Sequence, residues 1–254
     1  MINYQEIITR LNNKIITDGD LKNAKSNASH QVINPSNMLT IGVVAECDLN
    51  DVNDAMDAAK NAFISWKKIR SQERAELVRA AGAIINDHAE ELALIMSAET
   101  GKAIRTESRP ELSTIAATFN FYAGLALEIK GETIPFDPDM MTLTTREPLG
   151  VVAAIVPWNV PLLLMAMKVA PALVAGNTVV IKASPEASFC FARAVELMNK
   201  ILPKGVLNLI TGGAETGKLL AAQKDINKIA FTGSVEAGRD VYKSAAEKRI
   251  PVTL

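Results

Sequence analysis

The stretch that decides the fold is residues 147–188, which reads EPLGVVAAIVPWNVPLLLMAMKVAPALVAGNTVVIKASPEAS. It contains an apolar run at 151–156, a long apolar segment that begins at Pro161 and stops at Gly176, and a β-branched run at 178–182. Strand, helix and strand in that order form a βαβ unit. Both runs are apolar at nearly every position, which is typical of parallel strands covered by helices on both faces. The stretch therefore predicts a parallel sheet.

The same pattern recurs towards the end of the chain. Three expected helices, at 187–201, 214–222 and 235–246, alternate with three expected strands, at 206–210, 228–231 and 251–254. Five strands alternating with four helices predict a doubly wound parallel α/β sheet with right-handed crossovers. Because the chain ends inside the last expected strand, we expect this domain to be truncated.

The residues before the central unit predict a helical layer and edge strands. Residues 1–50 suggest an edge hairpin, with a turn at 33–36 and a short strand at 39–45. Apolar residues at the three-four spacing of an amphipathic helix then recur for 80 residues. They predict three helices, at 51–66, 71–100 and 110–131.

Residues 131–146 differ in character from the helices before them. They suggest two extended arms around the turn at Asp137-Pro138-Asp139, long and polar enough to project from a domain. The residues alone leave two interpretations open, an ordinary surface hairpin and an arm that contacts another subunit.

Composition excludes several classes of function. With 27 basic and 28 acidic residues the net charge is −1, so no charge excess recruits nucleic acid or an anionic membrane. Aromatic residues are only 5%, which argues against base-stacking surfaces. The most apolar stretch, Val160 to Ala175, contains Lys168 and is too short for a membrane span. We therefore expect a protein that binds neither nucleic acid nor membrane.

The two cysteines indicate a cellular compartment and not a catalytic thiol. Cys47 and Cys190 lack CxxC spacing, and no signal peptide follows Met1, so a cytoplasmic protein is expected. Cys190 lies among apolar helix residues, and Cys47 stands between two carboxylates that disfavour a thiolate. Neither is a persuasive nucleophile. No cluster of His, Cys and carboxylates has ligand spacing, so no metal site is expected.

Function is expected in the loops that follow the strands, because ligands of such sheets bind at the carboxyl ends of the strands. Glycines there let a backbone approach a ligand, and a helix N-terminus beside them favours a phosphate. These loops therefore favour a nucleotide. The residues concerned are Trp158, Asn159, Lys182, Ser184, Gly212, Gly213, Gly217, Gly233, Ser234 and Gly238.

Each of these loops also has an interpretation that needs no ligand. The glycine pairs could be plain turns or helix starts. Ser184, followed by Pro185 and Glu186, fits a helix N-cap equally well. Asn159 is equally explained by a bond to the backbone of its own turn.

Four motifs follow one another along the chain. They are Glu99-Thr100-Gly101-Lys102, Pro157-Trp158-Asn159-Val160-Pro161, Ala175-Gly176-Asn177-Thr178 through Lys182, and Phe231-Thr232-Gly233-Ser234 with Gly238. In combination they resemble the NAD(P)-dependent aldehyde dehydrogenase superfamily. The resemblance covers nearly the whole chain in order, and it implies the Rossmann-like cofactor domain of aldehyde dehydrogenase type, which lacks a GxGxxG fingerprint, as this chain does.

The resemblance implies a role for individual residues. Asn159 would stabilise the oxyanion of a thiohemiacetal, together with the backbone amide of a catalytic cysteine. Lys182 would bond the adenosine ribose, and Ser234 would contact the pyrophosphate. Val156 and Trp158 would line the cleft, and Gly213 and Gly217 would pack near the adenine. Pro157, Ser184, Phe231 and Gly233 complete the implied cofactor-binding set.

Two departures from the family pattern limit what the resemblance implies. In many members that prefer NAD, an acidic residue stands three positions after the lysine; here Pro185 stands there and Glu186 follows, so NAD and NADP both remain open. The chain also ends before the segments that carry the family's general-base glutamate and nucleophilic cysteine. The expected division is 1–130 for helices and edge strands, 131–146 for the arm and 147–254 for the cofactor-binding core, with the catalytic domain absent.

The resemblance implies the cofactor-binding portion of an enzyme that oxidises an aldehyde to a carboxylic acid. The partners would be NAD or NADP, the aldehyde and, in the complete enzyme, further copies of the same chain joined through the arm. The chain alone is expected to be inactive. The alternative is a non-catalytic module that binds a nucleotide or docks onto a partner.

Overall fold

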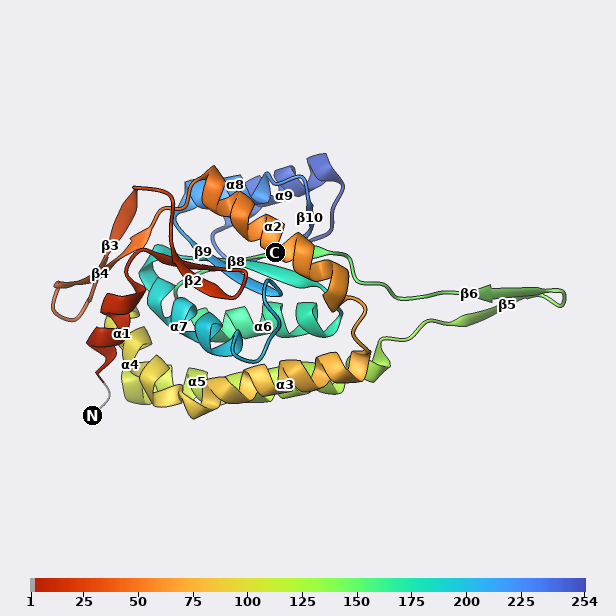
Figure 1. Cartoon of the computed structure of the whole chain (residues 1–254), viewed down its shortest axis with the longest axis horizontal. Coiled ribbons are helices and arrows are strands. Elements are labelled where there is room, and N and C mark those ends of the chain that lie inside the picture. The colour runs from red at the N-terminus through yellow and green to blue at the C-terminus, as the bar shows by residue number, and fades with distance from the viewer. Residues whose placement is uncertain (1–2) are drawn as a thin grey trace.

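A computed structural model describes residues 3–254 and has four layers (Figure 1). A central sheet carries α2, α8 and α9 on one face and α6 and α7 on the other, and α3, α4 and α5 form an outer layer against α6 and α7. A thin two-stranded arm projects far from this body.

The central sheet has seven strands in the order β11-β10-β7-β8-β9-β1-β2. The five strands from β11 to β9 are parallel, as expected for a doubly wound sheet. The winding changes direction at β7, which pairs with β8 on one side and β10 on the other. The seven strands are β1 Lys14–Thr17, β2 Asp20–Asn23, β7 Val151–Val156, β8 Thr178–Ala183, β9 Leu207–Thr211, β10 Ile226–Phe231 and β11 Val252–Thr253.

The two central strands are buried along their whole length. Every residue of β7 and β8 is buried, and the strands pair in parallel from Val151 with Thr178 to Val156 with Ala183. Because helices cover both faces, an unbroken apolar strand is favoured over an alternating one. This confirms the interpretation of residues 147–188.

Residues 1–50 supply the expected edge hairpin, but it lies at 14–23 and not around the expected turn at 33–36, which belongs to a separate two-stranded sheet. The hairpin of β1 and β2 pairs with β9 through Ile16 and Leu209 and closes that side of the sheet. Its strands have four residues each, too short for their alternation to stand out in the sequence.

The crossover helices agree with the predicted positions to within a few residues at their ends. One interpretation of Ser184 is wrong: a short 3-10 turn, Pro185–Ala187, intervenes, and α7 begins at Ser188. The Ser184 hydroxyl bonds Glu186 instead of capping a helix. The helices are α6 Pro161–Val174, α7 Ser188–Met198, α8 Ala214–Ala221 and α9 Val235–Lys248.

The single helix predicted at 71–100 is wrong. Two helices meet at His88, whose backbone (φ −111°, ψ 18°) leaves the helical region and whose side chain bonds Glu91. The preceding Asn86 and Asp87 are poor helix formers, which favours the break there. The helices of this half are α1 Tyr4–Leu11, which was not predicted, α2 Leu49–Trp66, α3 Ser71–Asp87, α4 Ala89–Thr100, a π-helical turn Ile104–Ser108, α5 Arg109–Gly124 and a 3-10 turn Ala126–Glu128.

Two hairpins lie outside the central sheet. The expected turn at 33–36 joins β3, Ser29–Ile33, to β4, Thr40–Ala45. The arm pairs β5, Thr133–Asp137, with β6, Met140–Leu143, and nearly all its residues are exposed.

Candidate functional site

The predicted site residues gather along the carboxyl edge of the sheet. One hollow, of about 590 Å³, lies over the point where the winding reverses, between β7, β8 and β10. A second, of about 720 Å³, adjoins it on the side of the β3–β4 hairpin. Lys182, Gly213 and Ala214 line both hollows, so the two adjoin, and together they are called the cleft.

Most of the residues predicted for the cofactor line this cleft. Phe231, Gly233 and Ser234 also line a third hollow, of about 530 Å³, on the far side of Phe231. The predicted residues found in the two joined hollows are Trp158, Lys182, Ser184, Gly213, Gly217, Phe231 and Ser234.

Val156 and Pro157 do not line these hollows. Val156, the last residue of β7, is only 2% exposed and belongs to the core between the sheet and α6. Its side chain faces that core because alternate residues of a strand point to opposite faces. The expectation that the Val156 side chain forms a wall of the cleft is therefore not met in this structure.

Lys182 is a buried cation at the wall of the cleft. It stands near the end of β8 and is only 7% exposed, and no acceptor among residues 3–254 lies within hydrogen-bond distance of its ammonium. Burial lowers the pKa of Lys182 to about 8, although the charges of Glu46 and Glu186 oppose the shift. The exposed part of Lys182 lines both hollows, so its ammonium can donate hydrogen bonds to a ligand in the cleft.

The N-terminus of α9 opens on the same cleft. Ser234 is the N-cap of this helix, and its Oγ accepts a hydrogen bond from the N–H of Ala237 (3.2 Å). Ser234, Glu236 and Ala237 all line the hollow over β10. A helix of this length presents backbone N–H groups and a partial positive charge to an anion at its start.

The N-termini of the other three crossover helices are occupied by glutamate side chains from the first half of the chain, of which Glu99 has its pKa raised to about 8 by burial. Glu111 accepts hydrogen bonds from the N–H groups of Leu162 (2.8 Å) and Leu163 (3.0 Å) at the start of α6. Glu99 accepts from Phe189 (2.9 Å) and Cys190 (2.8 Å) at the start of α7.

Glu46 occupies the third of these helix ends, that of α8. Its carboxylate accepts from the N–H of Gly213 (2.7 Å) and from the N–H and hydroxyl of Thr216 (3.2 and 2.8 Å), and it also pairs with His30. Burial alone would raise the pKa of Glu46, but the bonds from His30, Gly213 and Thr216 lower it to about 2. The expectation that the helix start at Gly212-Gly213 faces a phosphate is therefore wrong, because a carboxylate of the chain already fills it.

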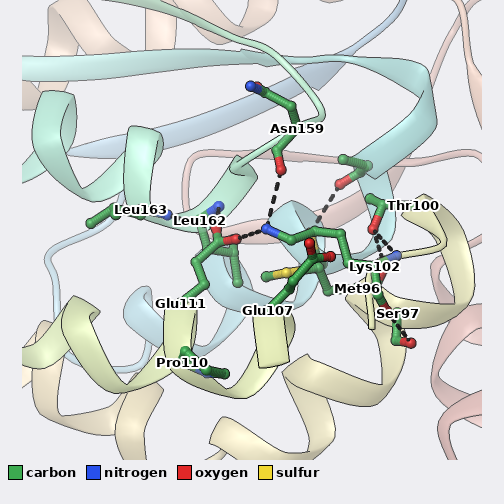
Figure 2. A network of polar contacts seen from close by, with 12 residues as sticks. Met96, Ser97, Thr100, Lys102, Glu107, Pro110, Glu111, Asn159, Leu162 and Leu163 are labelled. Atoms are coloured by element: carbon green, nitrogen blue, oxygen red, sulfur yellow. Dashed lines mark hydrogen bonds and ion pairs between the residues drawn. The ribbon is translucent and has the colours of Figure 1, made fainter. Parts of the chain in front are cut away.

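Asn159 lies at a separate position beside the cleft. It is exposed, and its side-chain amide makes no hydrogen bond within the described part of the chain. Its backbone carbonyl accepts a hydrogen bond from Lys102 Nζ (3.1 Å), and Lys102 pairs in turn with Glu111 (Figure 2). Asn159 shares a hollow of about 570 Å³ with Lys102, Glu111 and Trp158.

Sequence reasoning missed Glu46, Glu111 and the role of Lys102. Lys102 lies in one of the four motifs, but nothing in its spacing connects it with Asn159, which is 57 residues further along. Glu46 was noted only as a neighbour of Cys47. A carboxylate that caps a distant helix leaves no local pattern, because its partners are backbone N–H groups.

The cysteines behave as expected from the sequence. Both are buried; burial raises the pKa of Cys47 to about 12 and that of Cys190 well above its ordinary value. Over residues 3–254 there is no group of three His, Cys or carboxylate side chains placed to hold a metal ion. In the same range no helix has the length and apolarity to cross a membrane.

The strand order and the cleft at the reversal of the winding define a Rossmann-like α/β protein. More narrowly, the chain belongs to the aldehyde dehydrogenase family, whose family model matches residues 22–254. Both the fold class and the resemblance noted in the sequence are thus confirmed.

Individual relatives agree with this assignment. The chain is 37% identical over 246 residues to Aldehyde dehydrogenase family 2 member B4, mitochondrial, of Arabidopsis thaliana, covering 95% of this chain and 46% of the relative. It is 40% identical over 232 residues to (Z)-2-((N-methylformamido)methylene)-5-hydroxybutyrolactone dehydrogenase of Acinetobacter baylyi, covering 89% and 47%. The NAD+ complex of aldehyde dehydrogenase from Bacillus cereus superposes with a TM-score of 0.95 at 31% identity, covering 100% and 52%. The chain therefore spans about half the length of these relatives.

Proposed function

We propose that this chain is the NAD(P)-binding portion of an enzyme that oxidises an aldehyde to a carboxylic acid. The observation that carries the proposal is the position of Lys182: its side chain is largely buried, it lines two hollows beside the start of α9, and its ammonium bonds no acceptor among residues 3–254. Family membership and the NAD+ complex of the Bacillus cereus relative support the cofactor.

The cleft offers complementary groups to each part of a dinucleotide. Lys182 would donate to the adenosine ribose hydroxyls, and the N–H groups at the start of α9, with Ser234, would hold the pyrophosphate. Gly217, where an added Cβ would meet nothing within 4 Å, would leave room for the adenine, with Gly213 beside it in the same hollow. The bound cofactor would supply a hydride acceptor.

Asn159 would act on the substrate side of the reaction. Its free amide can donate a hydrogen bond to an aldehyde oxygen as negative charge develops there, the usual role of an oxyanion donor. The described residues offer no activated thiol, because both cysteines are buried with a raised pKa. We therefore propose that these 254 residues alone do not oxidise aldehyde. Aldehyde-dependent formation of NADH by the pure chain, lost in Asn159→Ala, would contradict this.

The test of the main proposal is a calorimetric titration of the chain with NAD and, separately, with NADP. Saturable binding of one of them, weakened at least tenfold by Lys182→Ala, is the expected result. Lys204→Ala is the matched control, because Lys204 is an exposed lysine paired with Asp20 on β2, away from the residues of the cleft. If a folded wild-type chain binds neither nucleotide, the proposal fails for this chain.

A second proposal concerns assembly, and the arm favours it. Phe136, Met140 and Met141 are 75%, 60% and 82% exposed, an unusual display of apolar side chains on a thin hairpin. We propose that the arm contacts further copies of the chain. The alternative is that the arm docks onto another protein.

The cytoplasmic location expected from the sequence stays a prediction. One relative is named as mitochondrial.

A further inference from the structure

The loop that carries Asn159 lacks the local bonds that usually fix such a turn. The N-cap residue of α6 is Val160, which has no side-chain acceptor, and Pro161 follows it. Asn159 itself is exposed, and its side-chain amide points away from Lys102 (Figure 2). What holds the loop must therefore come from elsewhere in the chain.

Glu111 supplies the missing cap. It projects from α5, its side chain is only 3% exposed, and one oxygen, Oε1, accepts from the N–H groups of both Leu162 and Leu163. These are the first free N–H groups of α6, because Pro161 has none. The carboxylate thus fixes the start of the helix directly after the loop.

Lys102 connects this cap to Asn159. Its side chain is 14% exposed, and its ammonium donates both to the second oxygen of Glu111, Oε2, and to the backbone carbonyl of Asn159 (3.1 Å). One ammonium therefore bonds the residue before Val160 and the carboxylate that caps the helix after it (Figure 2). The carbonyl of Asn159 is held while its amide stays free.

We infer that Lys102 and Glu111 are positioning residues for Asn159, holding its loop so that the amide is in place before a substrate oxygen becomes negative. The inference rests on the proposed function, in which Asn159 is the oxyanion donor. Such a donor is effective only when its position is set in advance, because reorganisation during the reaction would cancel the gain. A buried, charge-assisted pair is a stiffer support than a solvated one.

The test uses the neighbouring Trp158 as a reporter of the loop. The chain has two tryptophans: Trp158 is 51% exposed, and Trp66 is 1% exposed in the core. In a chain labelled with 5-fluorotryptophan, 19F NMR gives one resonance for each, and Trp158→Phe assigns them. We expect Lys102→Met to shift the Trp158 resonance by more than its line width, or to split it, while the Trp66 resonance stays in place.

Two further variants separate positioning from general stability. Lys102→Arg keeps a charged donor that can reach both acceptors, so it should restore the wild-type Trp158 resonance. Lys60→Met removes an exposed pair with Asp225 (2.6 Å) and should leave both resonances unchanged. A Trp158 resonance in Lys102→Met that superimposes on the wild type would overturn the inference.

If loss of the Trp66 resonance shows that Lys102→Met does not fold, the measurement moves to Lys102→Met/Glu111→Leu. Removing both charges avoids an unpaired buried carboxylate. An altered Trp158 resonance with native Trp66 supports the inference, and an unaltered one overturns it. Nucleotide titration of the wild type is read separately: absent binding counts against the proposed function, whatever Trp158 does.

Discussion

At the scale of single residues, the buried charge of Lys182 lowers the stability of the ligand-free fold. Burial lowers the pKa of Lys182 from 10.5 to about 8, so at pH 7 the lysine is still charged in the native state, where that charge is less favourable than in the unfolded state. Each pH unit of such lowering corresponds to about 1.4 kcal/mol. Lys182→Met should therefore raise the free energy of unfolding of the ligand-free chain at pH 7 by up to about 3 kcal/mol, while weakening nucleotide binding.

The pH dependence gives the sign of this effect. Below pH 8 the penalty is complete; it disappears as the pH rises from 8 to 10.5, because the native lysine then loses its proton more readily than the unfolded one. Urea unfolding across this range should bring the free energies of unfolding of wild type and Lys182→Met together. Parallel curves for Lys182→Met would contradict the prediction.

Glu46 should show the opposite behaviour. Burial opposes ionisation, but the bonds from His30, Gly213 and Thr216 lower the pKa of Glu46 to about 2, below its ordinary 4.5. Its contribution is therefore present above pH 4.5 and is lost as the pH falls towards 2. Glu46→Gln should lower the free energy of unfolding at pH 7 by about 1–2 kcal/mol, allowing for solvent screening. Thermal unfolding from pH 7 to pH 2.5 checks this, and a difference that does not shrink in acid would argue against it.

At the scale of elements, α8 carries a glycine where a helix favours alanine. A Cβ at Gly217 would meet nothing within 4 Å, yet Gly217 lines the hollow assigned to the nucleotide. Gly217→Ala should therefore stabilise the ligand-free chain by roughly 0.5–1 kcal/mol and weaken the binding of NAD or NADP. Gly124→Ala, at the equally open end of α5, is the control and should leave binding unchanged. Unchanged affinity in Gly217→Ala would mean that the adenine lies elsewhere.

The elements also mark the boundary of what the sequence predicts. Long apolar runs and glycine loops predicted β7 to β10 and α6 to α9 because each pattern is local. The break at His88 leaves the apolar spacing of the two helices intact, and the strands of the β1–β2 hairpin have only four residues each, so periodicity predicted neither. The site divides in the same way: Lys182 follows from its strand end, whereas Glu46 and Glu111 act on backbone groups far along the chain.

At the scale of the whole molecule, the arm is the feature whose role is least explained by the body of the protein. Its apolar side chains contact little else, so their loss should not affect folding. The double variant Phe136→Lys/Met141→Lys should still fold cooperatively in thermal unfolding. Its molar mass, measured by light scattering after size exclusion, should fall from that of an oligomer to that of a monomer. A wild type that is already a monomer at all concentrations would contradict the proposed assembly.

The edge strand β1 has a consequence for how the protein is made. Ile16 pairs with Leu209, so 193 residues (209 − 16) separate the two sides of that contact. At ribosomal speeds of about 5–20 residues per second, roughly 10–40 s pass between the synthesis of β1 and that of β9, the strand with which it pairs. Glu46, Glu99 and Glu111 also precede the helices that they cap, by 167, 90 and 51 residues. We therefore expect the nascent first half to need protection from aggregation, by chaperones, until the sheet has been synthesised.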